Sequence, residues 1–379
     1  MKASNKVYVF GGNHHNTLGV IRSLGQKGIS SVLLLVDDNT KRGHYVGKSR
    51  YISERHLFSA YREGVEFLMK QKREEIKDVV ICCSDGASSA IDMEYDALSQ
   101  SYYIPNCLKQ GEISRLMSKE VLAEEAKKYG LNVPQTWLSY NGAIPDGVTF
   151  PCIIKPLYSK DGSKNDISVC NNREELNQYF KNEHCDALQI QAFIVKDFEY
   201  QLIGCSISSG KEIVIPGVSK VIRPSKTSNT GFLYYHSLDD SYSIDEVKRM
   251  LKGMHYSGLF SVEFLRDKDG KDFFMEVNFR NDGNAISVTA AGVNLPYIWY
   301  CSAENASNVP KIEEIHPVFV MPEFDDLVHV FHHNITFKTW LKDMRRADCY
   351  MEYDKHDVKP YLYRVKDFCG LLIKKMFRR

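Results

Sequence analysis

Two short segments of the chain alternate apolar and polar positions in the way that paired β-strands do. In residues 273–280 this alternation places Glu276, Asn278 and Arg280 on one face, and residues 259–264 place Glu263 on the corresponding face. The other face is apolar in both segments. It consists of Phe273, Met275, Val277 and Phe279 in one segment and of Phe260, Val262 and Phe264 in the other.

The residues between these segments predict that the two strands pair. Asp267-Lys268-Asp269-Gly270 is a turn-forming sequence suited to joining antiparallel neighbours. Pairing brings together Glu263, Glu276 and the amide oxygen of Asn278, which are hard oxygen ligands of the kind Mg²⁺ accepts. Arg280, on the same face, is suited to an anion held by that metal. The alternative is a solvated hairpin face without chemistry.

The first hundred residues read as a small parallel α/β domain. A strand at 6–10, a helix at 16–27 and a strand at 32–36 form a β-α-β unit, and a further buried strand is predicted at 79–83. Gly11, Gly12 and Gly19 do not complete the glycine fingerprint of dinucleotide-binding folds, so a nicotinamide cofactor is disfavoured.

The middle of the chain predicts one helix and several strands around a polar loop. Ser118 to Tyr129 reads as a helix that ends before Gly130, and Lys155 closes the apolar strand 151–156. The loop 158–165 that follows is either a phosphate-covering lid or an ordinary surface loop. Further elements are a helix at 173–181, strands at 187–194, from 197 and at 214–222, and a helix at 245–254 beneath the acidic strands.

Composition limits the class of protein. A chain of 379 residues predicts two or three packed subdomains, and 43% hydrophobic with 26% charged residues is ordinary for a globular protein. A net charge of +1 argues against a general nucleic-acid binder. Ten cysteines without a CxxC pair indicate reduced thiols, and the histidine pairs 14–15 and 332–333 lack further spaced metal ligands. With no signal peptide or membrane-spanning run, we expect a cytoplasmic protein.

Several motifs, taken in order, resemble the ATP-grasp superfamily, and within it the carbamoyl-phosphate-synthase-like carboxylate-amine ligases, including the D-aspartate ligase type. The likeness covers roughly residues 6–300. The motifs are Met117-Ser118-Lys119, Ile153-Ile154-Lys155-Pro156, Gln191-Ala192-Phe193-Ile194, Val262-Glu263-Phe264 and Glu276-Val277-Asn278-Phe279-Arg280.

The resemblance implies a fold of mixed α/β and α+β class. Residues 1–115 would form an N-terminal parallel α/β (pre-ATP-grasp) domain, and residues 116–305 an ATP-grasp domain. In that domain two α+β subdomains, a lid-bearing one at 116–195 and a metal-site one at 196–305, would clasp ATP. Residues 306–379 would be a C-terminal extension.

The resemblance also implies roles for individual residues. The phosphates would meet Lys119, Lys155 and the lid residues Gly162 and Ser163, the adenine would lie against Gln191, Phe193 and Ile194, and the ribose would bind Glu199. Mg²⁺, or Mn²⁺, would bind Glu263, Glu276 and Asn278. Arg280 would stabilise the transferred phosphoryl group or an oxyanion. Two features depart from the family pattern. Phe279 stands where proline is usual, and the lid is poor in glycine.

The implied activity is ATP-dependent joining of a carboxylate to an amine through an acyl phosphate, with release of ADP and phosphate. The alternatives are a kinase or carboxylase acting on a small carboxylate, or a non-catalytic nucleotide-binding protein. Amino acids are the expected substrates. Asp85 is a candidate to bind the ammonium group of a substrate; the alternative is that it caps the following helix. Lys220 and Arg223, in a basic loop, are candidates to bind a substrate carboxylate; the alternative is a solvated run of charges.

The C-terminal sequence is aromatic and basic. It predicts a helix that docks on the protein's own core or, alternatively, contacts an anionic membrane surface. A homodimer is compatible with the sequence, which does not fix the oligomeric state.

Overall fold

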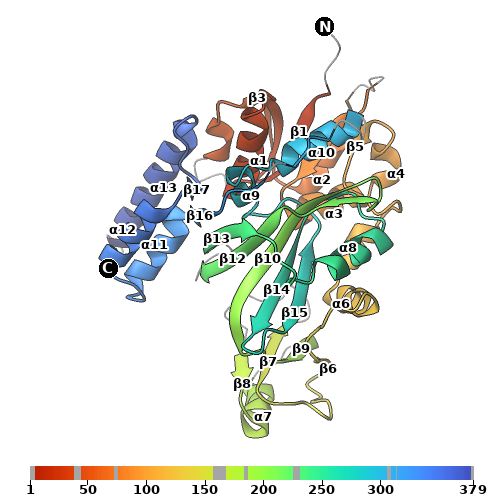
Figure 1. Ribbon diagram of the computed structural model, residues 1–379, viewed down its shortest axis with the longest axis vertical. Coiled ribbons are helices and arrows are strands. Elements are labelled where there is room, and N and C mark those ends of the chain that lie inside the picture. The colour runs from red at the N-terminus through yellow and green to blue at the C-terminus, as the bar shows by residue number, and fades with distance from the viewer. Residues whose placement is uncertain are drawn as a thin grey trace.

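Three β-sheets organise the part of the chain that the structure describes. The computed structural model describes residues 5–37, 44–71, 76–156, 168–182, 187–224, 231–304, 309–312 and 314–376. In Figure 1 a parallel sheet lies at one end, a long central sheet runs from it, and a small lobe lies at the opposite end, with three C-terminal helices along one side. The fold is the predicted mixture of parallel α/β and antiparallel α+β structure.

The N-terminal sheet is five-stranded and parallel, in the order β3-β2-β1-β4-β5. The inner strands β1, β2 and β4 are mainly apolar because both faces are covered: Val7 and Val9 of β1 enter one core, and Tyr8 and Phe10 enter another. The edge strand β3 is polar and largely exposed. The predicted β-α-β opening is therefore confirmed. The elements are β1 (Val7–Gly12), α1 (His15–Gly25), β2 (Ser31–Val36), η1 (Val46–Lys48), β3 (Ile52–Phe58), α2 (Tyr61–Met69), β4 (Asp78–Cys82), α3 (Asp85–Asp92), α4 (Tyr95–Leu98) and β5 (Tyr102–Tyr103).

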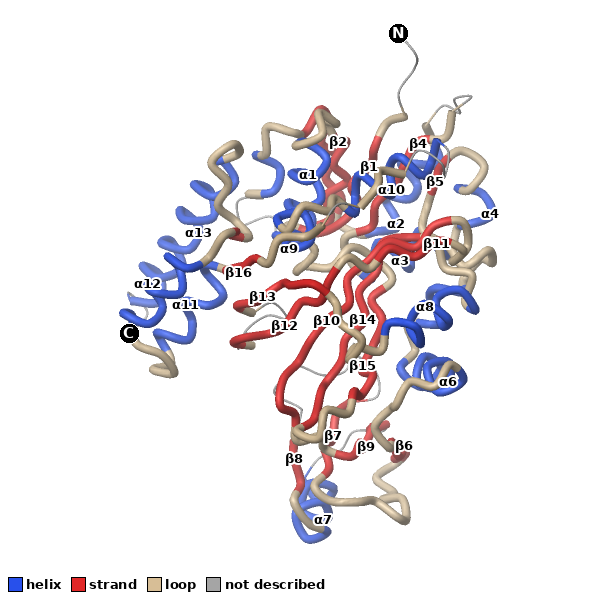
Figure 2. The backbone as a smooth tube through the Cα atoms, viewed as in Figure 1, coloured by secondary structure: helices blue, strands red, loops and turns tan. Residues whose placement is uncertain are grey.

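Two helices lead from this sheet to the small lobe. The predicted helix at 118–129 is confirmed as α6, which begins after Ser118 and ends before Gly130, a glycine with φ of 87°. The lobe is an antiparallel four-stranded sheet of order β6-β9-β7-β8 covered by α7 (Figure 2). The elements are α5 (Glu112–Leu116), α6 (Lys119–Lys128), β6 (Thr136–Tyr140), β7 (Cys152–Pro156), β8 (Ser168–Cys170), α7 (Arg173–Asn182) and β9 (Ala187–Ala192).

The central sheet has eight strands in the order β15-β14-β10-β12-β13-β16-β17, with β11 paired to β10. As predicted, α8 packs beneath the acidic strands, because its Val247, Met250 and Leu251 share a core with Phe260 and Val262 of β14. The elements are β10 (Lys196–Ile207), β11 (Glu212–Val214), β12 (Gly217–Arg223), β13 (Phe232–Ser237), α8 (Ile244–Gly253), β14 (Gly258–Asp267), β15 (Asp272–Asn278), α9 (Ile286–Ala290), α10 (Leu295–Glu304), β16 (Val318–Met321) and β17 (Cys349–Tyr350).

The alternation predicted for residues 273–280 is wrong at the start of β15. The β14–β15 pairing shifts register, with Glu263 opposite Glu276 but Phe264 opposite Phe274. This bulge puts Phe274 in the core at 2% exposure and turns Met275 toward a cavity, whereas Phe273 and Met275 were expected to be core residues. Strand β15 also ends at Asn278, so Phe279 and Arg280 follow it.

The C-terminal residues are integrated into the fold. Strands β16 and β17 extend the central sheet, and the helices α11 (Glu323–Phe331), α12 (Phe337–Arg346) and α13 (Val358–Met376) lie together beside it (Figure 1). None of the helices described is long and apolar enough to cross a bilayer. The division of the chain into domains at residues 115 and 305 stays a prediction.

Candidate active site

A cavity of about 680 Å³ lies between the small lobe and the central sheet. This volume is within the range of small-molecule sites. Its walls come from the start of α6, from β6, β7 and β9 on one side, and from β10, β14 and β15 on the other. Eight residues predicted to bind nucleotide or metal line it: Lys119, Lys155, Gln191, Phe193, Ile194, Glu199, Glu263 and Glu276.

Two carboxylates face each other at the sheet wall of the cavity. Glu263 and Glu276 occupy directly opposed positions of β14 and β15. Burial raises the pKa of Glu263, and the negative charges of Glu276 and Asp282 raise it further. Gln201 donates a hydrogen bond to Glu263 at 2.9 Å. Two close, half-buried carboxylates make this a place where a cation is favoured.

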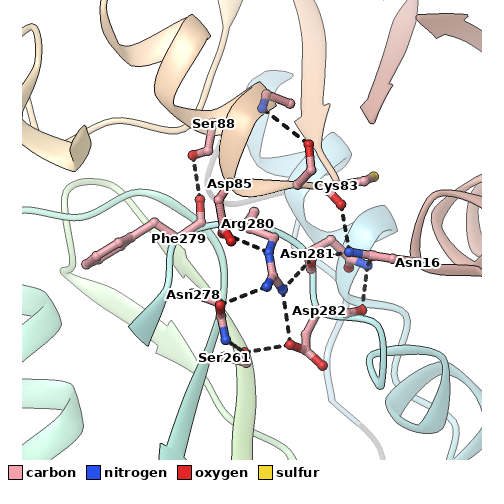
Figure 3. Close-up of polar contacts among 12 residues, drawn as sticks. Asn16, Cys83, Asp85, Ser88, Ser261, Asn278, Phe279, Arg280, Asn281 and Asp282 are labelled. Atoms are coloured by element: carbon pink, nitrogen blue, oxygen red, sulfur yellow. Dashed lines mark hydrogen bonds and ion pairs between the residues drawn. The ribbon is translucent and has the colours of Figure 1, made fainter. Parts of the chain in front are cut away.

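Asn278, the last residue of β15, and Arg280, in the loop that follows the strand, lie side by side (Figure 3). The Asn278 side-chain nitrogen donates to Glu263 at 3.2 Å, while its oxygen accepts from Arg280 Nη2 at 2.7 Å. A metal ligand role for Asn278 therefore requires its amide to turn. Within the described residues, no three His, Cys, Asp or Glu side chains converge in metal-binding geometry, so this set consists of two carboxylates and an amide.

Acidic groups on both sides hold Arg280 in place. Its Nε donates to Asp85 at 3.0 Å, and its Nη1 donates to Asp282 at 3.1 Å. The guanidinium is 14% exposed, whereas Asp85 is 62% exposed. Ser84 rather than Asp85 caps α3, because its hydroxyl accepts from the Ala87 amide. The capping alternative for Asp85 is therefore wrong.

A hydrogen-bond network ties this corner to the N-terminal sheet (Figure 3). Asn16 donates to the carbonyls of Cys83 at 2.8 Å and Asn281 at 2.7 Å, and the Asn281 side chain donates back to Asn16. Ser88 donates to the Phe279 carbonyl at 2.7 Å. The loop that carries Arg280 is thus fixed by α1 and α3, so the site is assembled from segments 191 to 265 residues apart along the chain.

Lysine side chains enter the cavity from the small lobe. Lys155 donates to Gln191 Oε1 at 3.1 Å, and Gln191 in turn donates to Thr136 at 3.1 Å. Burial and, after it, the positive charge of Lys119 together lower the pKa of Lys155 to about 8, against the attraction of Glu276. The half-buried ammonium groups of Lys119 and Lys155 repel each other, and a polyanion bound between them would relieve that repulsion.

The hinge between lobe and sheet presents apolar side chains to solvent. Phe193 is 37% exposed and Val195 is 56% exposed, and both line the cavity with Ile194. Exposed apolar groups in a concave site are typical of a surface that a ligand covers. Glu199 lines the same end of the cavity and forms an ion pair with Lys196. Its side chain is one-third exposed and is therefore accessible to a ligand hydroxyl.

The remaining predicted residues lie elsewhere. Lys220 and Arg223 belong to β12 and not to a loop, and neither lines the cavity. The Lys220 ammonium lies 3.8 Å from the centre of the Phe198 ring. Arg223 binds the carboxylates of Asp326 at 2.8 Å and Asp343 at 2.9 Å. Gly162 and Ser163 lie outside the described residues.

Sequence reasoning missed three polar residues that support the site. Gln201 bonds to both Glu263 and Asn284, and Asp282 bonds to both Arg280 and Ser261. Asp282 and Asn284 follow Arg280 closely enough to have been suspected, and Gln201 alternates with Glu199 on β10. Alternation alone could not show which partners these side chains meet.

Proteins of known structure share this fold. Neither the protein-family models nor the curated protein sequences give a match. Solved structures do. An L-amino acid ligase from Bacillus licheniformis has a TM-score of 0.63 at 15% identity, covering 84% of this chain and 80% of that chain.

Two further structures belong to carboxylating enzymes. An N5-carboxyaminoimidazole synthetase from Staphylococcus aureus has a TM-score of 0.62 at 16% identity, covering 89% and 87% of the two chains. A biotin carboxylase domain of 2-oxoglutarate carboxylase from Hydrogenobacter thermophilus, solved with MgADP and bicarbonate, has a TM-score of 0.62 at 13% identity, covering 84% and 74%. The chain therefore has the ATP-grasp fold, which confirms the predicted fold class.

Proposed function

We propose that this protein is an ATP- and Mg²⁺-dependent carboxylate-amine ligase, which activates a small carboxylate as an acyl phosphate and transfers the acyl group to an amine. The observation that carries the proposal is one cavity with Lys155 on its lobe side and the pair Glu263 and Glu276 on its sheet side, with Arg280 held close by through its bond to Asn278. Cations from one lobe and carboxylates from the other suit a metal-bound triphosphate. The ligases and carboxylases that share the fold support the same reading.

The residues of the cavity fit such a metal. Burial and then the charge of Glu276 raise the pKa of Glu263 although Arg280 lowers it, so a further cation at this pair of carboxylates would be favoured. When bound, Mg²⁺ would screen the phosphate oxygens and lower the charge that builds up during phosphoryl transfer. Glu263, Glu276 and, after its amide turns, Asn278 would hold it; Mn²⁺ is a compatible substitute.

In the first step the substrate carboxylate attacks the γ-phosphorus, an O–P bond forms, and the bond to ADP breaks. The chain's contribution is to position and to stabilise charge. Lys119 and Lys155 would orient the triphosphate from the lobe side. Arg280, held by Asp85 and Asp282, would face the transferred phosphoryl group with a guanidinium whose direction is already set.

In the second step the amine attacks the acyl carbon, loses a proton, and phosphate leaves. Arg280 would then stabilise the tetrahedral oxyanion. Asp85, exposed and next to Arg280, is the described carboxylate best placed to attract an amine, and amino acids are the proposed substrates. Excluding water matters, since an acyl phosphate hydrolyses readily.

The discriminating experiment measures ADP and phosphate release from ATP and Mg²⁺ with pools of carboxylic acids and amines, including amino acids. Release that needs both an acid and an amine supports the ligase. A phosphorylated product without amine would indicate a kinase, and turnover that needs bicarbonate would indicate a carboxylase. Tight ATP binding without turnover under any combination would contradict an enzymatic role.

A first prediction concerns Lys155. Replacing it by methionine should weaken ATP binding roughly 10- to 100-fold, because one of two convergent cations that meet the triphosphate is lost. Isothermal titration calorimetry measures the dissociation constant. The matched control is Lys109→Met, which removes an exposed lysine outside the cavity and should leave binding unchanged. Equal affinities for the two variants would exclude Lys155 from the nucleotide site.

The lowered pKa of Lys155 predicts a proton linkage. Since the free ammonium titrates at about pH 8, bound phosphates should raise its pKa, so ATP binding should take up a proton above that pH. Affinity should then fall as the pH rises. Calorimetry in two buffers of different ionisation enthalpy measures the uptake, which should vanish in Lys155→Arg although binding persists. An uptake unchanged in this variant would assign the proton to another group.

A further inference from the structure

The turn between α11 and α12 carries two aromatic side chains that the protein leaves in solvent. Phe331, the last residue of α11, is 55% exposed, and Phe337, the first residue of α12, is 58% exposed. These are among the most exposed large apolar side chains of the described residues. Neither belongs to any of the hydrophobic cores.

The turn itself is well ordered by hydrogen bonds. His333 adopts a left-handed φ of 57°, and its amide donates to the Val330 carbonyl at 3.1 Å. The Asn334 amide donates to the His329 carbonyl at 2.9 Å, and the Thr336 hydroxyl caps α12 by accepting from Thr339 at 3.1 Å. The two phenylalanines are therefore displayed by a fixed turn between two helices, which in Figure 1 lies at the outer end of the C-terminal helices.

Positive charge lies along the helix that follows the turn. Helix α12 bears four exposed cations, Lys338, Lys342, Arg345 and Arg346, in a chain whose net charge is only +1. None of the four forms an ion pair with a carboxylate of the described residues. The one acidic residue of α12, Asp343, is neutralised by Arg223 at 2.9 Å.

We propose that this surface, the aromatic turn with its basic helix, docks on an anionic lipid surface. Phenylalanine side chains at a tip can enter the interface between headgroups and acyl chains, while lysine and arginine remain among anionic headgroups. The partner is a membrane surface and not a second copy of the chain, because a two-fold contact through this turn would bring the same four cations against each other.

The test is cosedimentation of the full chain with two vesicle types, phosphatidylcholine alone and phosphatidylcholine containing phosphatidylglycerol. We expect binding to the anionic vesicles only, weakened by added salt. The variant Phe331→Ser/Phe337→Ser should reduce the partition coefficient roughly tenfold or more, and Lys338→Glu/Lys342→Glu roughly tenfold or more. Leu57→Ser and Lys109→Glu, which change exposed residues elsewhere, should bind as the wild type does.

Three results would overturn the proposal: no binding to either vesicle type, equal binding to both types, or unchanged binding by the turn variants. Light scattering after size exclusion gives a fourth outcome. A wild-type dimer that the phenylalanine variant converts to a monomer would assign the surface to self-association instead. The vesicle experiment uses neither ATP nor turnover, so its failure would leave the proposed ligase activity untouched. Circular dichroism of each variant checks that it is folded.

Discussion

Replacing Glu276 by glutamine is expected to reduce ADP formation roughly 100- to 1000-fold while the fold persists. The substitution removes one of two opposed carboxylates at the cavity wall, and with it half of the charge that would hold the metal. A coupled assay of ADP release at saturating ATP and Mg²⁺ measures the loss. Glu212→Gln, the same chemical change at an exposed position of β11, should retain full activity.

The same variant should gain stability in the absence of metal. A carboxyl group whose pKa is raised by folding destabilises the native state once the pH exceeds the pKa that the group has in the unfolded chain. Glu263 is such a group, and after burial the charge of Glu276 contributes most to its raised pKa. Removing it lets Glu263 ionise at lower cost. Thermal midpoints of metal-free wild type should therefore fall more steeply from acidic to neutral pH than those of Glu276→Gln.

This combination distinguishes a functional pair from a structural one. If the two glutamates served the fold, the substitution would lower the thermal midpoint, and activity would fall with stability. Loss of turnover with equal or higher stability is the pattern expected where a protein holds like charges together for a ligand. Normal turnover in Glu276→Gln would remove the metal assignment, and with it the main support for the ligase.

Local sequence patterns predicted much of this site because its residues stand at the ends or on the polar faces of strands. Lys155 was evident as a charge that closes an apolar run, and Glu263 as a polar position in an alternating segment; both line the cavity. The register shift between β14 and β15 could not be read from the sequence, since one extra residue in a strand leaves the composition unchanged. It moved Phe274 into the core and Met275 out of it.

Long-range partners explain the other differences. Arg223 was a reasonable anion-binding candidate, but its guanidinium binds Asp326 and Asp343, more than a hundred residues away along the chain. The pairing of Asp85 with Arg280 likewise depends on how the N-terminal sheet meets the central sheet. A sequence shows that a charge exists at such positions, whereas only the packed elements show which opposite charge neutralises it.

The second large effect is expected at Asp357, which joins the C-terminal residues to the N-terminal sheet. Its carboxylate accepts from Arg22 Nε at 3.2 Å, from the Ser49 hydroxyl at 2.7 Å and from the Arg50 amide at 2.9 Å. Arg22 and Asp357 are each 2% exposed. Asp357→Ala should cost about 3–5 kcal/mol, because it removes the hydrogen-bonded anion of a buried guanidinium and leaves the Asp354 carboxylate at 4.0 Å as its neighbour. Urea unfolding followed by circular dichroism measures the change.

A matched control and a double variant make this prediction specific. Glu66→Ala removes the partner of Arg62 in a surface pair, whose arginine is 88% exposed, and should change stability by less than about 0.5 kcal/mol. Arg22→Met/Asp357→Ala should be more stable than Asp357→Ala alone, since no buried charge then lacks a partner. If Asp357→Ala matched Glu66→Ala, the C-terminal helices would be an appendage that the N-terminal sheet does not need. If instead the double variant recovers stability, residues 314–376 fold in one cooperative unit with α1, which carries Arg22. Because α1 also carries Asn16, that unit then holds Asn16 against the loop that bears Arg280.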